Sequence, residues 1–436
     1  MANKLNQTDA GFDAAFETLL GQKRETDADV NATVADILSD VRARGDAAVI
    51  DYTNRFDRLN LQTGKDLLVS AEEIKAAIAD CDDATLDALK IAADRIASYH
   101  EKQKPEDLSY TDADGIELGY RWTAIENVGL YVPGGLATYP SSVLMNAIPA
   151  KVAGASRLVM VVPTPDGAIN PLVLAAADLC GVDEVYRIGG AQAVAALAYG
   201  TETIAKVDKI VGPGNAFVAT AKKQVFGTVG IDMIAGPSEI LVVADNKNDP
   251  AWIAADLLSQ AEHDPVAQSI LITDDAAFAV SVEEAVQSHL KNLPRTEIAA
   301  ASWKDYGAVI VVDDISRDAP ALVDRLAPEH LELCVDDPKA LSEKIRHAGA
   351  IFMGRYTPEA IGDYIAGPNH VLPTARTARF SSGLSTLDFM KRSSLIQLDA
   401  DGLGLIGPPA VRLAQSEGLG AHALSIAIRL NMPDQT

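Results

Sequence analysis

The spacing of apolar side chains changes near residue 125. Between residues 27 and 105 they recur at steps of three and four, which places them on one face of a helix and predicts a mainly helical segment. Gly45 and Pro105 divide this segment, because glycine and proline rarely continue a helix.

Beyond residue 125, short apolar runs alternate with segments of helical spacing. Runs that are apolar throughout are typical of strands buried on both faces, and their alternation with helices predicts parallel sheets in an α/β fold. The runs cover residues 128–132, 157–163, 184–188, 208–212, 238–245, 269–273 and 307–314. Helical spacing returns after about residue 385, where glycines and the pair Pro408 and Pro409 divide it into pieces that predict a small domain or an arm.

Length and composition indicate a folded protein with several domains. A chain of 436 residues is too long for one hydrophobic core, and 48% hydrophobic with 22% charged residues is close to globular averages. Cys81, Cys180 and Cys334 lie far apart without paired spacing, so we expect neither a disulfide framework nor a thiolate zinc site.

The charge excludes some classes of partner. A net charge of -24, from 61 acidic and 37 basic residues, repels phosphate backbones and anionic lipid surfaces, so we expect neither nucleic acid nor membrane as a partner. The N-terminal residues lack the basic start and apolar run of a signal peptide, and no stretch reaches the length that spans a bilayer, which favours a cytoplasmic protein.

Three of the predicted strands lead into glycine-rich turns. These lie at residues 131–135, 188–192 and 211–215, and glycine lets the backbone approach a ligand closely. None has the Gly-x-Gly-x-x-Gly spacing of a standard dinucleotide-binding turn. By themselves they are more typical of ordinary strand-to-helix turns.

Two pairs of polar residues are candidates for chemistry. The stretch 250–262 predicts a short helix, and Gln260 and His263 share one face at its end. Glu329 and His330 place an acid beside a base, either of which can transfer protons. Each pair alone is also common in structural roles.

A metal site is a further hypothesis. Gln260, His263, Asp363 and His422 together offer the mixed nitrogen and oxygen ligands that suit Zn²⁺. Their spacing does not show that they converge, and a neutral glutamine is a weak ligand. His370, like His422, follows a glycine-rich break, although each alone is more typical of a structural residue. The residues by themselves leave the metal site open.

Short strings of residues along nearly the whole chain carry a stronger signal. They cover residues 128–135, 139–154, 189–192, 212–215, 231–239, 260–263, 327–331, 362–364 and 369–373, with Glu417 and His422 near the end. In this order they closely resemble the histidinol dehydrogenase family.

The resemblance implies two incomplete Rossmann-like domains with parallel sheets, and small helical N- and C-terminal segments that form a dimerisation arm. Residues 26–130 and 239–384 would form the first domain, with the zinc and the catalytic residues. Residues 131–238 would form the second, which contacts NAD, and residues 1–25 and 385–436 would form the arm.

The resemblance also implies a homodimer with one Zn²⁺ per subunit. Gln260, His263 and Asp363 of one subunit and His422 of the other would bind the metal and contact the substrate. Glu417 would cross the interface with His422 to contact the substrate, so separated monomers would lose part of each site.

The remaining contacts follow from the same resemblance. Ser238 and His330 would complete the substrate contacts. Tyr131, Gln192 and Asn215 would bind NAD, which gives the glycine-rich turns a purpose without the standard spacing.

The implied activity is the NAD-dependent, four-electron oxidation of L-histidinol to L-histidine through L-histidinaldehyde, in the last steps of histidine biosynthesis. Zinc would position the substrate, His330 would act as general base, and Glu329 would activate water. Arg376 departs from the family pattern, which usually has a small residue there, but it coincides with no proposed ligand and we interpret it as subfamily variation, although a basic side chain near the site can alter substrate contacts.

Two alternatives are open, and the second belongs to a different functional class. The first is a dehydrogenase of the same architecture that acts on another polar alcohol, such as a sulfonated propanediol. Glu329, His330, Glu417 and His422 argue against it, because an enzyme with a changed substrate is expected to lack some of them. The second is a catalytically silent zinc- or nucleotide-binding protein, which zinc content without turnover of any alcohol would favour.

Overall fold

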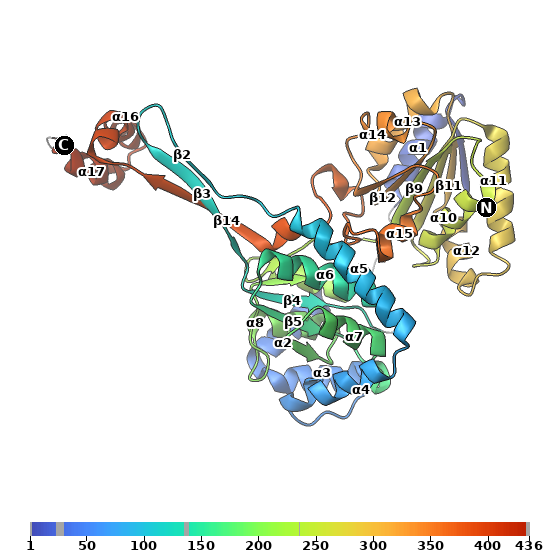
Figure 1. Ribbon diagram of the computed structural model, residues 1–436, viewed down its shortest axis with the longest axis horizontal. Coiled ribbons are helices and arrows are strands. Elements are labelled where there is room, and N and C mark those ends of the chain that lie inside the picture. Colours follow the sequence, from blue (N-terminus) through green and yellow to red (C-terminus); the bar gives the residue numbers. More distant parts are fainter. Residues whose placement is uncertain (1, 23–29, 135–138, 235, 433–436) are drawn as a thin grey trace. The chain divides into compact units, whose positions relative to one another are not determined.

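Three β-sheets organise the chain in a computed structural model, which describes residues 2–22, 30–134, 139–234 and 236–432 (Figure 1). The chain divides into a large unit, Met1–Gln103 with Glu126–Phe389, and a small unit, Lys104–Ile125 with Met390–Thr436. The large unit holds two parallel sheets, named sheet A and sheet B below, and the small unit holds an antiparallel one. The α/β fold with parallel sheets is therefore confirmed.

Sheet A has six parallel strands in the order β1 (Asn3–Asn6), β11 (Ala308–Val311), β10 (Gln268–Thr273), β9 (Glu239–Ala244), β12 (His330–Cys334) and β13 (Ala350–Met353). Its helices are α1 (Phe12–Gly21), α10 (Pro250–Ala261), α11 (Ala276–His289), α12 (Thr296–Asp305), α13 (Ile315–Leu326), α14 (Pro338–Ser342) and α15 (Glu359–Tyr364). These elements are called lobe A.

The central strands of sheet A are buried on both faces, as the apolar runs that form β9, β10 and β11 predict, whereas the edge strands β1 and β13 are partly exposed. Leu331 and Leu333 of β12 pack in the cluster that contains α1 and α13. Cys334 packs in the opposite cluster, with α10, α11 and α12. Because side chains alternate along a strand, His330 and Glu332 also face the side of α10. This alternation decides which helix supplies the neighbours of His330.

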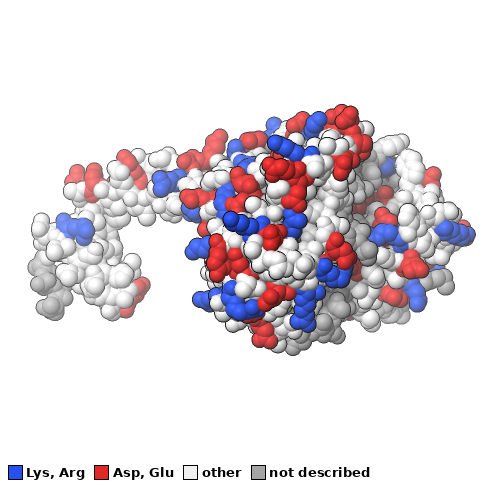
Figure 2. Space-filling view, turned by 90° about the horizontal axis from the view of Figure 1, so that it is seen from below, with Lys and Arg blue, Asp and Glu red and all other residues white. Residues whose placement is uncertain are grey.

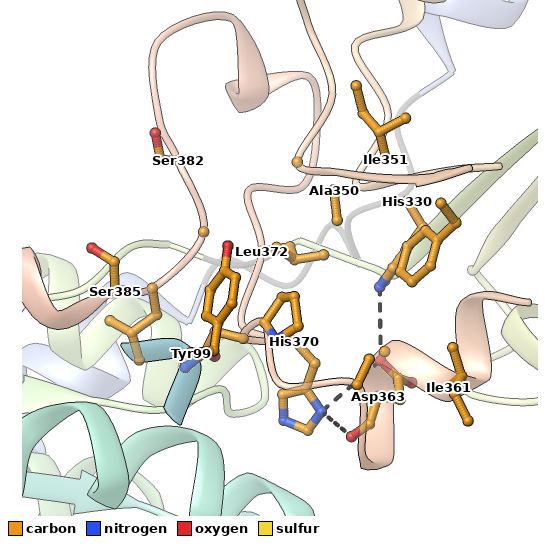
Figure 3. Close-up of a pocket in the computed structure, with 18 of the residues that line it drawn as sticks. Tyr99, His330, Ala350, Ile351, Ile361, Asp363, His370, Leu372, Ser382 and Ser385 are labelled. Atoms are coloured by element: carbon orange, nitrogen blue, oxygen red, sulfur yellow. Dashed lines mark hydrogen bonds and ion pairs between the residues drawn. The ribbon is translucent and has the colours of Figure 1, made fainter. Parts of the chain in front are cut away.

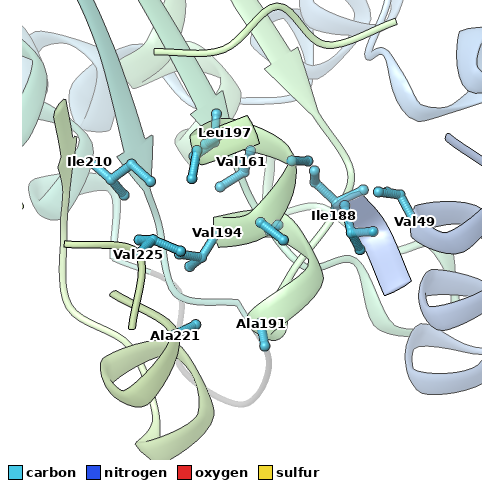
Figure 4. Close-up of a cluster of buried hydrophobic side chains, with 14 of the residues drawn as sticks. Val49, Val161, Ile188, Ala191, Val194, Leu197, Ile210, Ala221 and Val225 are labelled. Atoms are coloured by element: carbon cyan, nitrogen blue, oxygen red, sulfur yellow. The ribbon is translucent and has the colours of Figure 1, made fainter. Parts of the chain in front are cut away.

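Sheet B has five parallel strands in the order β6 (Glu184–Tyr186), β5 (Arg157–Val161), β4 (Asn127–Tyr131), β7 (Lys209–Val211) and β8 (Gly230–Ile231). Its helices are α2 (Asn31–Arg44), α3 (Asp46–Asp57), α4 (Ala71–Ala79), α5 (Asp83–Glu101), α6 (Pro140–Ala153), α7 (Pro171–Leu179), α8 (Gly190–Tyr199) and α9 (Ala216–Val225). These elements are called lobe B. One face of sheet B carries a cluster shared with α2, α3, α8 and α9, part of which Figure 4 shows.

The small unit pairs β14 (Met390–Gln397) with β3 (Glu117–Ala124), and β3 with β2 (Leu108–Thr111), all antiparallel. Helices α16 (Ala400–Ser416) and α17 (Gly420–Ala427) pack on each other. The helical character of the C-terminal residues is confirmed, whereas the antiparallel sheet was not predicted. Two of its strands come from residues 104–125, which the sequence analysis had placed elsewhere.

The apolar runs predicted as strands form β4, β5, β6, β7, β9, β10 and β11. The segment predicted as helical forms α2 to α5, and Gly45 separates α2 from α3 with a backbone φ of 54°. The predicted helix at 250–262 is α10, where the Asp249 carboxylate accepts the Ala251 N–H at 2.8 Å. The short strands β1, β8, β12 and β13 were not predicted.

The predicted division into domains differs from the structure. Residues 31–101 were assigned with 239–384, but α2 and α3 bury their apolar faces on sheet B, which forms from later residues. Residues 1–25 were assigned to the arm, but β1 pairs with β11 and α1 packs in lobe A. Such contacts join distant residues, so local spacing does not reveal them. The boundary placed between residues 25 and 26 lies outside the described residues.

Charged side chains of both signs are interspersed over the face of the large unit that Figure 2 shows. The three cysteines form no disulfide. Over the described residues, the structure has no helix with both the length and the apolarity needed to cross a bilayer.

The core of lobe B gives the first prediction. Leu197 is fully buried in the cluster of Figure 4, so Leu197→Ala removes contacts and leaves a cavity. We expect a loss of about 2–5 kcal/mol in the free energy of unfolding, measured by urea denaturation. Leu179→Ala on α7, where the side chain is 42% exposed, is the control and should change the stability by less than about 0.5 kcal/mol. Equal effects of the two variants would contradict this account of the core.

Candidate functional site

The predicted catalytic and metal-binding residues of lobe A lie where the strands of sheet A begin. Glu329 and His330 stand at the start of β12, and Ser238 directly precedes β9. A helix that connects two parallel strands runs back along the sheet, so the last turn of α10 returns to the edge where these strands start. Gln260 and His263 are at that end of α10. The parallel topology thus explains why residues about 70 apart in sequence belong to one site.

His330 is buried, and a contact with the backbone fixes the tautomer of its imidazole. Its Nδ1 lies 3.0 Å from the carbonyl oxygen of Glu239, so this nitrogen carries the proton and donates it. The other nitrogen, Nε2, has no hydrogen-bond partner among the described residues, and lies 3.7 Å from Glu359 Oε1 and 3.8 Å from Asp363 Oδ1. Burial lowers the pKa of His330 to about 4. The imidazole is therefore neutral near pH 7, with a lone pair on Nε2.

Glu329 and Glu239 hold each other through their backbones. The Glu239 N–H donates to Glu329 Oε2 at 2.9 Å, and the Glu329 N–H donates to Glu239 Oε2 at 3.3 Å. Glu329 Oε2 is also 3.6 Å from His330 Nδ1. Glu329 therefore lies on the Nδ1 side of the imidazole, and Glu359 lies on the Nε2 side.

Helix α15 brings two carboxylates to His330. Glu359 and Asp363 are four residues apart and share one face. Burial raises the pKa of Asp363 well above its usual value, and the charge of Glu359 raises it further. Within the described residues, His330, Glu359 and Asp363 are the group of three whose possible ligand atoms all lie within 4.8 Å of one another.

Gln260 and His263 contribute further polar groups near this cluster. Gln260 is 1% exposed, and its Oε1 has no hydrogen-bond partner in the described part of the chain. Burial lowers the pKa of His263, against the opposing charge of Glu359. This charge effect, together with that of His263 on His330, indicates that the end of α10 lies beside the cluster.

Two residues of the cluster, His330 and Asp363, border a cavity of about 520 Å³ (Figure 3). His330, Asp363 and His370 line it together with Tyr99 of α5 and Leu372. His370 donates from Nδ1 to the Asp363 carbonyl oxygen at 3.0 Å, and burial lowers its pKa to about 4. His370, interpreted from sequence as structural, thus lies in the wall of the site.

A second pair of acids lies behind the cluster. Asp256 of α10 and Glu332 of β12 share a hydrogen bond, and burial raises the pKa of both, that of Asp256 to about 6. Glu332 Oε1 also accepts the N–H of Glu359 at 2.5 Å. The buried pair therefore holds the start of α15, which carries Glu359 and Asp363.

The residues predicted to contact NAD lie in lobe B, where the strands of sheet B end. Tyr131 ends β4, and its hydroxyl oxygen accepts the N–H of Gly190 at 3.1 Å; burial raises its pKa to about 12. Gln192 of α8 is 2% exposed, and its Oε1 lacks a hydrogen-bond partner among the described residues. Asn215 caps α9 and accepts the N–H of Phe217 at 3.1 Å. Gly135 of the first glycine-rich turn lies outside the described residues.

The other predicted residues are distributed as follows. Ser238 is half-buried beside β9, and its carbonyl oxygen accepts the Gln268 N–H at 3.0 Å. Glu417 and His422 belong to the small unit, where both are exposed. Arg376 has a positive φ of 64° and follows Ala375, whose N–H donates to Glu239 Oε1 at 3.0 Å.

Sequence reasoning missed Glu359, Glu239, Glu332 and Asp256. The spacing of Glu359 and Asp363 was a usable signal, because residues four apart share a helix face. Glu239 and Glu332 lie inside strand-forming segments, where their chemistry depends on the pairing of strands.

Comparisons with known proteins agree with this architecture. The family model described as histidinol dehydrogenase matches residues 20–430. A histidinol dehydrogenase of Rhodospirillum rubrum is 68% identical over 431 residues, 99% of each chain, and one of Mesorhizobium japonicum is 63% identical over 99% of this chain and 100% of its own. The crystal structure of histidinol dehydrogenase from Elizabethkingia anophelis has a TM-score of 0.93 at 37% identity, covering 99% of this chain and 98% of that one.

Two parallel sheets and a buried histidine that lines a cavity, taken with these matches, define an α/β oxidoreductase. The chain belongs to the histidinol dehydrogenase family.

The buried acids give a prediction for pH dependence. Burial raises the pKa of Asp256 to about 6 in the folded protein, above its unfolded value of 3.8. The folded state therefore holds the proton more tightly, and this group lowers stability progressively as pH rises from about 4 to about 6. Asp256→Asn removes the titration, so its stability relative to the unmodified protein should increase by about 1–2 kcal/mol between pH 5 and pH 7.5. Urea denaturation at both pH values measures the difference, and a constant difference would contradict the burial argument.

Proposed function

We propose that the protein oxidises L-histidinol to L-histidine through L-histidinaldehyde, with NAD as oxidant and Zn²⁺ as the metal, in the last steps of histidine biosynthesis. The observation that carries this proposal is His330, a neutral and buried base whose unbonded Nε2 faces Asp363 and Glu359 beside a cavity large enough for a small amino alcohol. Family membership supports the choice of substrate. A cytoplasmic location remains a prediction.

The donor set fits zinc. Gln260, His263 and Asp363 offer an amide oxygen, an imidazole nitrogen and a carboxylate oxygen, the ligand types that Zn²⁺ accepts. The buried Oε1 of Gln260, without a hydrogen-bond partner among the described residues, is the orphaned atom that a cation would satisfy. When bound, zinc would supply a Lewis acid that orients the substrate nitrogens. We propose these three residues and a His422 from the second subunit as its ligands.

His330 supplies the base for both oxidation steps. With its Nδ1 proton fixed by the Glu239 carbonyl oxygen, Nε2 is free to remove the hydroxyl proton of the alcohol, and later that of the hydrated aldehyde. An imidazole accepts a proton only in its neutral form, and the lowered pKa of His330 keeps it in that form near pH 7. Glu329 is proposed to activate the water that forms the hydrate, and its carboxylate lies next to the same imidazole.

Lobe B would bind NAD, which accepts the electrons removed in each step. The proposed contacts are Tyr131, Gln192 and Asn215, which lie at the carboxyl edge of sheet B, the usual position of ligands on parallel sheets. The Gln192 amide oxygen is buried and without a hydrogen-bond partner among the described residues, as expected of a group that awaits a ligand.

A homodimer is proposed because the small unit exposes many large apolar side chains. They include Leu395, Ile396, Leu405, Leu413, Leu424 and Ile428, which are 46–69% exposed. Soluble monomers rarely leave so much apolar surface uncovered. The same unit carries Glu417 and His422, so a second subunit that covers it would receive these two residues.

Substrate turnover tests the proposed function. The purified protein should form two NADH for each histidine produced from L-histidinol, because the oxidation removes four electrons. Chelation should abolish NADH formation, and added zinc should restore it. Normal zinc content without turnover of histidinol would reject this substrate and favour the oxidation of another alcohol.

Mixed dimers test whether the site is shared between subunits. His263→Ala and His422→Ala should each be inactive as homodimers. In a random mixture of equal amounts, half of the dimers combine the two variants and each of these rebuilds one intact site, so activity should return to about a quarter of normal. Activity that stays at background after subunit exchange would show that His422 serves its own chain.

A further inference from the structure

A buried ion pair lies behind the glycine-rich turn that follows β7. Lys222 of α9 contacts Asp232, which follows β8, and the two side chains are 3% and 1% exposed. Neither residue belongs to the proposed catalytic or cofactor contacts. Because two buried charges lose their hydration, such a pair is a weak source of stability, and its best-attested use is to specify one geometry.

The pair binds both polar backbone groups of Gly212. The Gly212 N–H donates to Asp232 Oδ2 at 2.8 Å, and Lys222 Nζ donates to the Gly212 carbonyl oxygen at 2.8 Å. Gly212 is the first residue after β7, so the two side chains fix the backbone where the sheet ends and the turn begins.

The conformation fixed in this way is unusual. Gly212 has a φ of 112°, and a Cβ there would lie 2.0 Å from the carbonyl oxygen of Tyr131. The turn therefore packs directly on the backbone of Tyr131, one of the proposed NAD contacts. A small displacement of Gly212 would change the surface that these two strand ends present together.

Hydrogen bonds connect the turn at residues 212–215 to the following helix, α9, at two points. Asn215 caps α9 by accepting the N–H groups of Phe217 and Val218 at 3.1 and 3.2 Å. Lys222, seven residues further along α9, reaches back to Gly212. Neither the turn nor the helix can then shift without breaking the contacts of the buried pair.

We propose that Lys222 and Asp232 are positioning residues that hold the turn at residues 212–215 in the conformation that receives the dinucleotide. This inference rests on the proposed function, because the dinucleotide is NAD. The pair acts through Gly212 and Asn215 and contacts no ligand itself. Its effect is on the affinity for the cofactor, since a turn that samples other conformations binds in proportion to its competent fraction.

The test compares Asp232→Asn, Lys222→Met and the double variant with the unmodified zinc-loaded enzyme. The KM for NAD should rise roughly tenfold, as expected if about a tenth of the molecules keep the competent turn. The KM for L-histidinol and the zinc content should stay within about twofold, because those groups are in lobe A. A fluorescence titration with NADH, without substrate, measures the same loss of affinity independently of turnover.

Glu184→Gln is the matched control. It breaks the ion pair of Arg157 and Glu184, whose Nε and Oε1 are 2.6 Å apart, at the opposite edge of the same sheet. Its KM for NAD should not change, even where its stability falls. If a single variant does not fold, the double variant, which leaves no unpaired charge, decides the question.

An unchanged KM for NAD in the folded double variant, or an equal rise in Glu184→Gln, would overturn the inference. These results differ from a failure of the proposed function, in which the unmodified enzyme itself would reduce no NAD with L-histidinol.

Discussion

The register of β12 against β9 is the constraint on which the site depends. Pairing His330 with Ile240 sets Glu329 beside Glu239, although these two glutamates are 90 residues apart in the chain. The same register aims the Glu239 carbonyl oxygen at His330 Nδ1 and so selects the tautomer of the imidazole. A slip by one residue would turn His330 to the opposite face of the sheet, among the apolar residues of α1 and α13. The position of His330, its tautomer and its acidic neighbour therefore follow from one strand pairing.

The local pattern of apolar residues predicted most helices and strands, but it did not predict which of them pair or pack together. The seven apolar runs and the helices of residues 27–105 formed as predicted, because burial on both faces and amphipathic spacing leave a direct trace in sequence. The pairing of β1 with β11 and the packing of α2 on sheet B leave no such trace in the local sequence. The predicted domain boundaries therefore differ from those of the structure. For the site, Gln260, His263, Asp363, Glu329 and His330 were candidates from their residue types and spacing, and the family resemblance supplied their expected roles. Glu359 was missed although its distance from Asp363 on one helix face is visible in the sequence.

The two lobes use opposite edges of their sheets. In lobe B the proposed NAD contacts follow the ends of strands, where glycine-rich turns let the backbone approach a ligand. In lobe A the proposed base, His330, stands where the strands begin, and the returning ends of connecting helices supply its neighbours. The glycine-rich turns therefore indicated a possible binding edge of lobe B in the sequence. The site of lobe A has no such turn, and only the identity of its polar residues indicated it.

The balance of charge around His330 supports the proposal of a metal at this site. Glu239, Glu329 and Glu359 are buried acids, and the neighbouring histidines His330 and His370 have pKa values of about 4, so near neutral pH they carry no compensating charge. Among the described residues that line the cavity there is no lysine or arginine. Burial disfavours the charged form of a carboxylate, and a buried carboxylate relieves this cost by taking up a proton or by binding a metal. The raised pKa of Asp363 corresponds to the uptake of a proton. A bound divalent cation would instead favour the ionised carboxylate of this residue. The neutral histidines then serve two purposes, since an uncharged imidazole is both a better base and a better ligand than a protonated one.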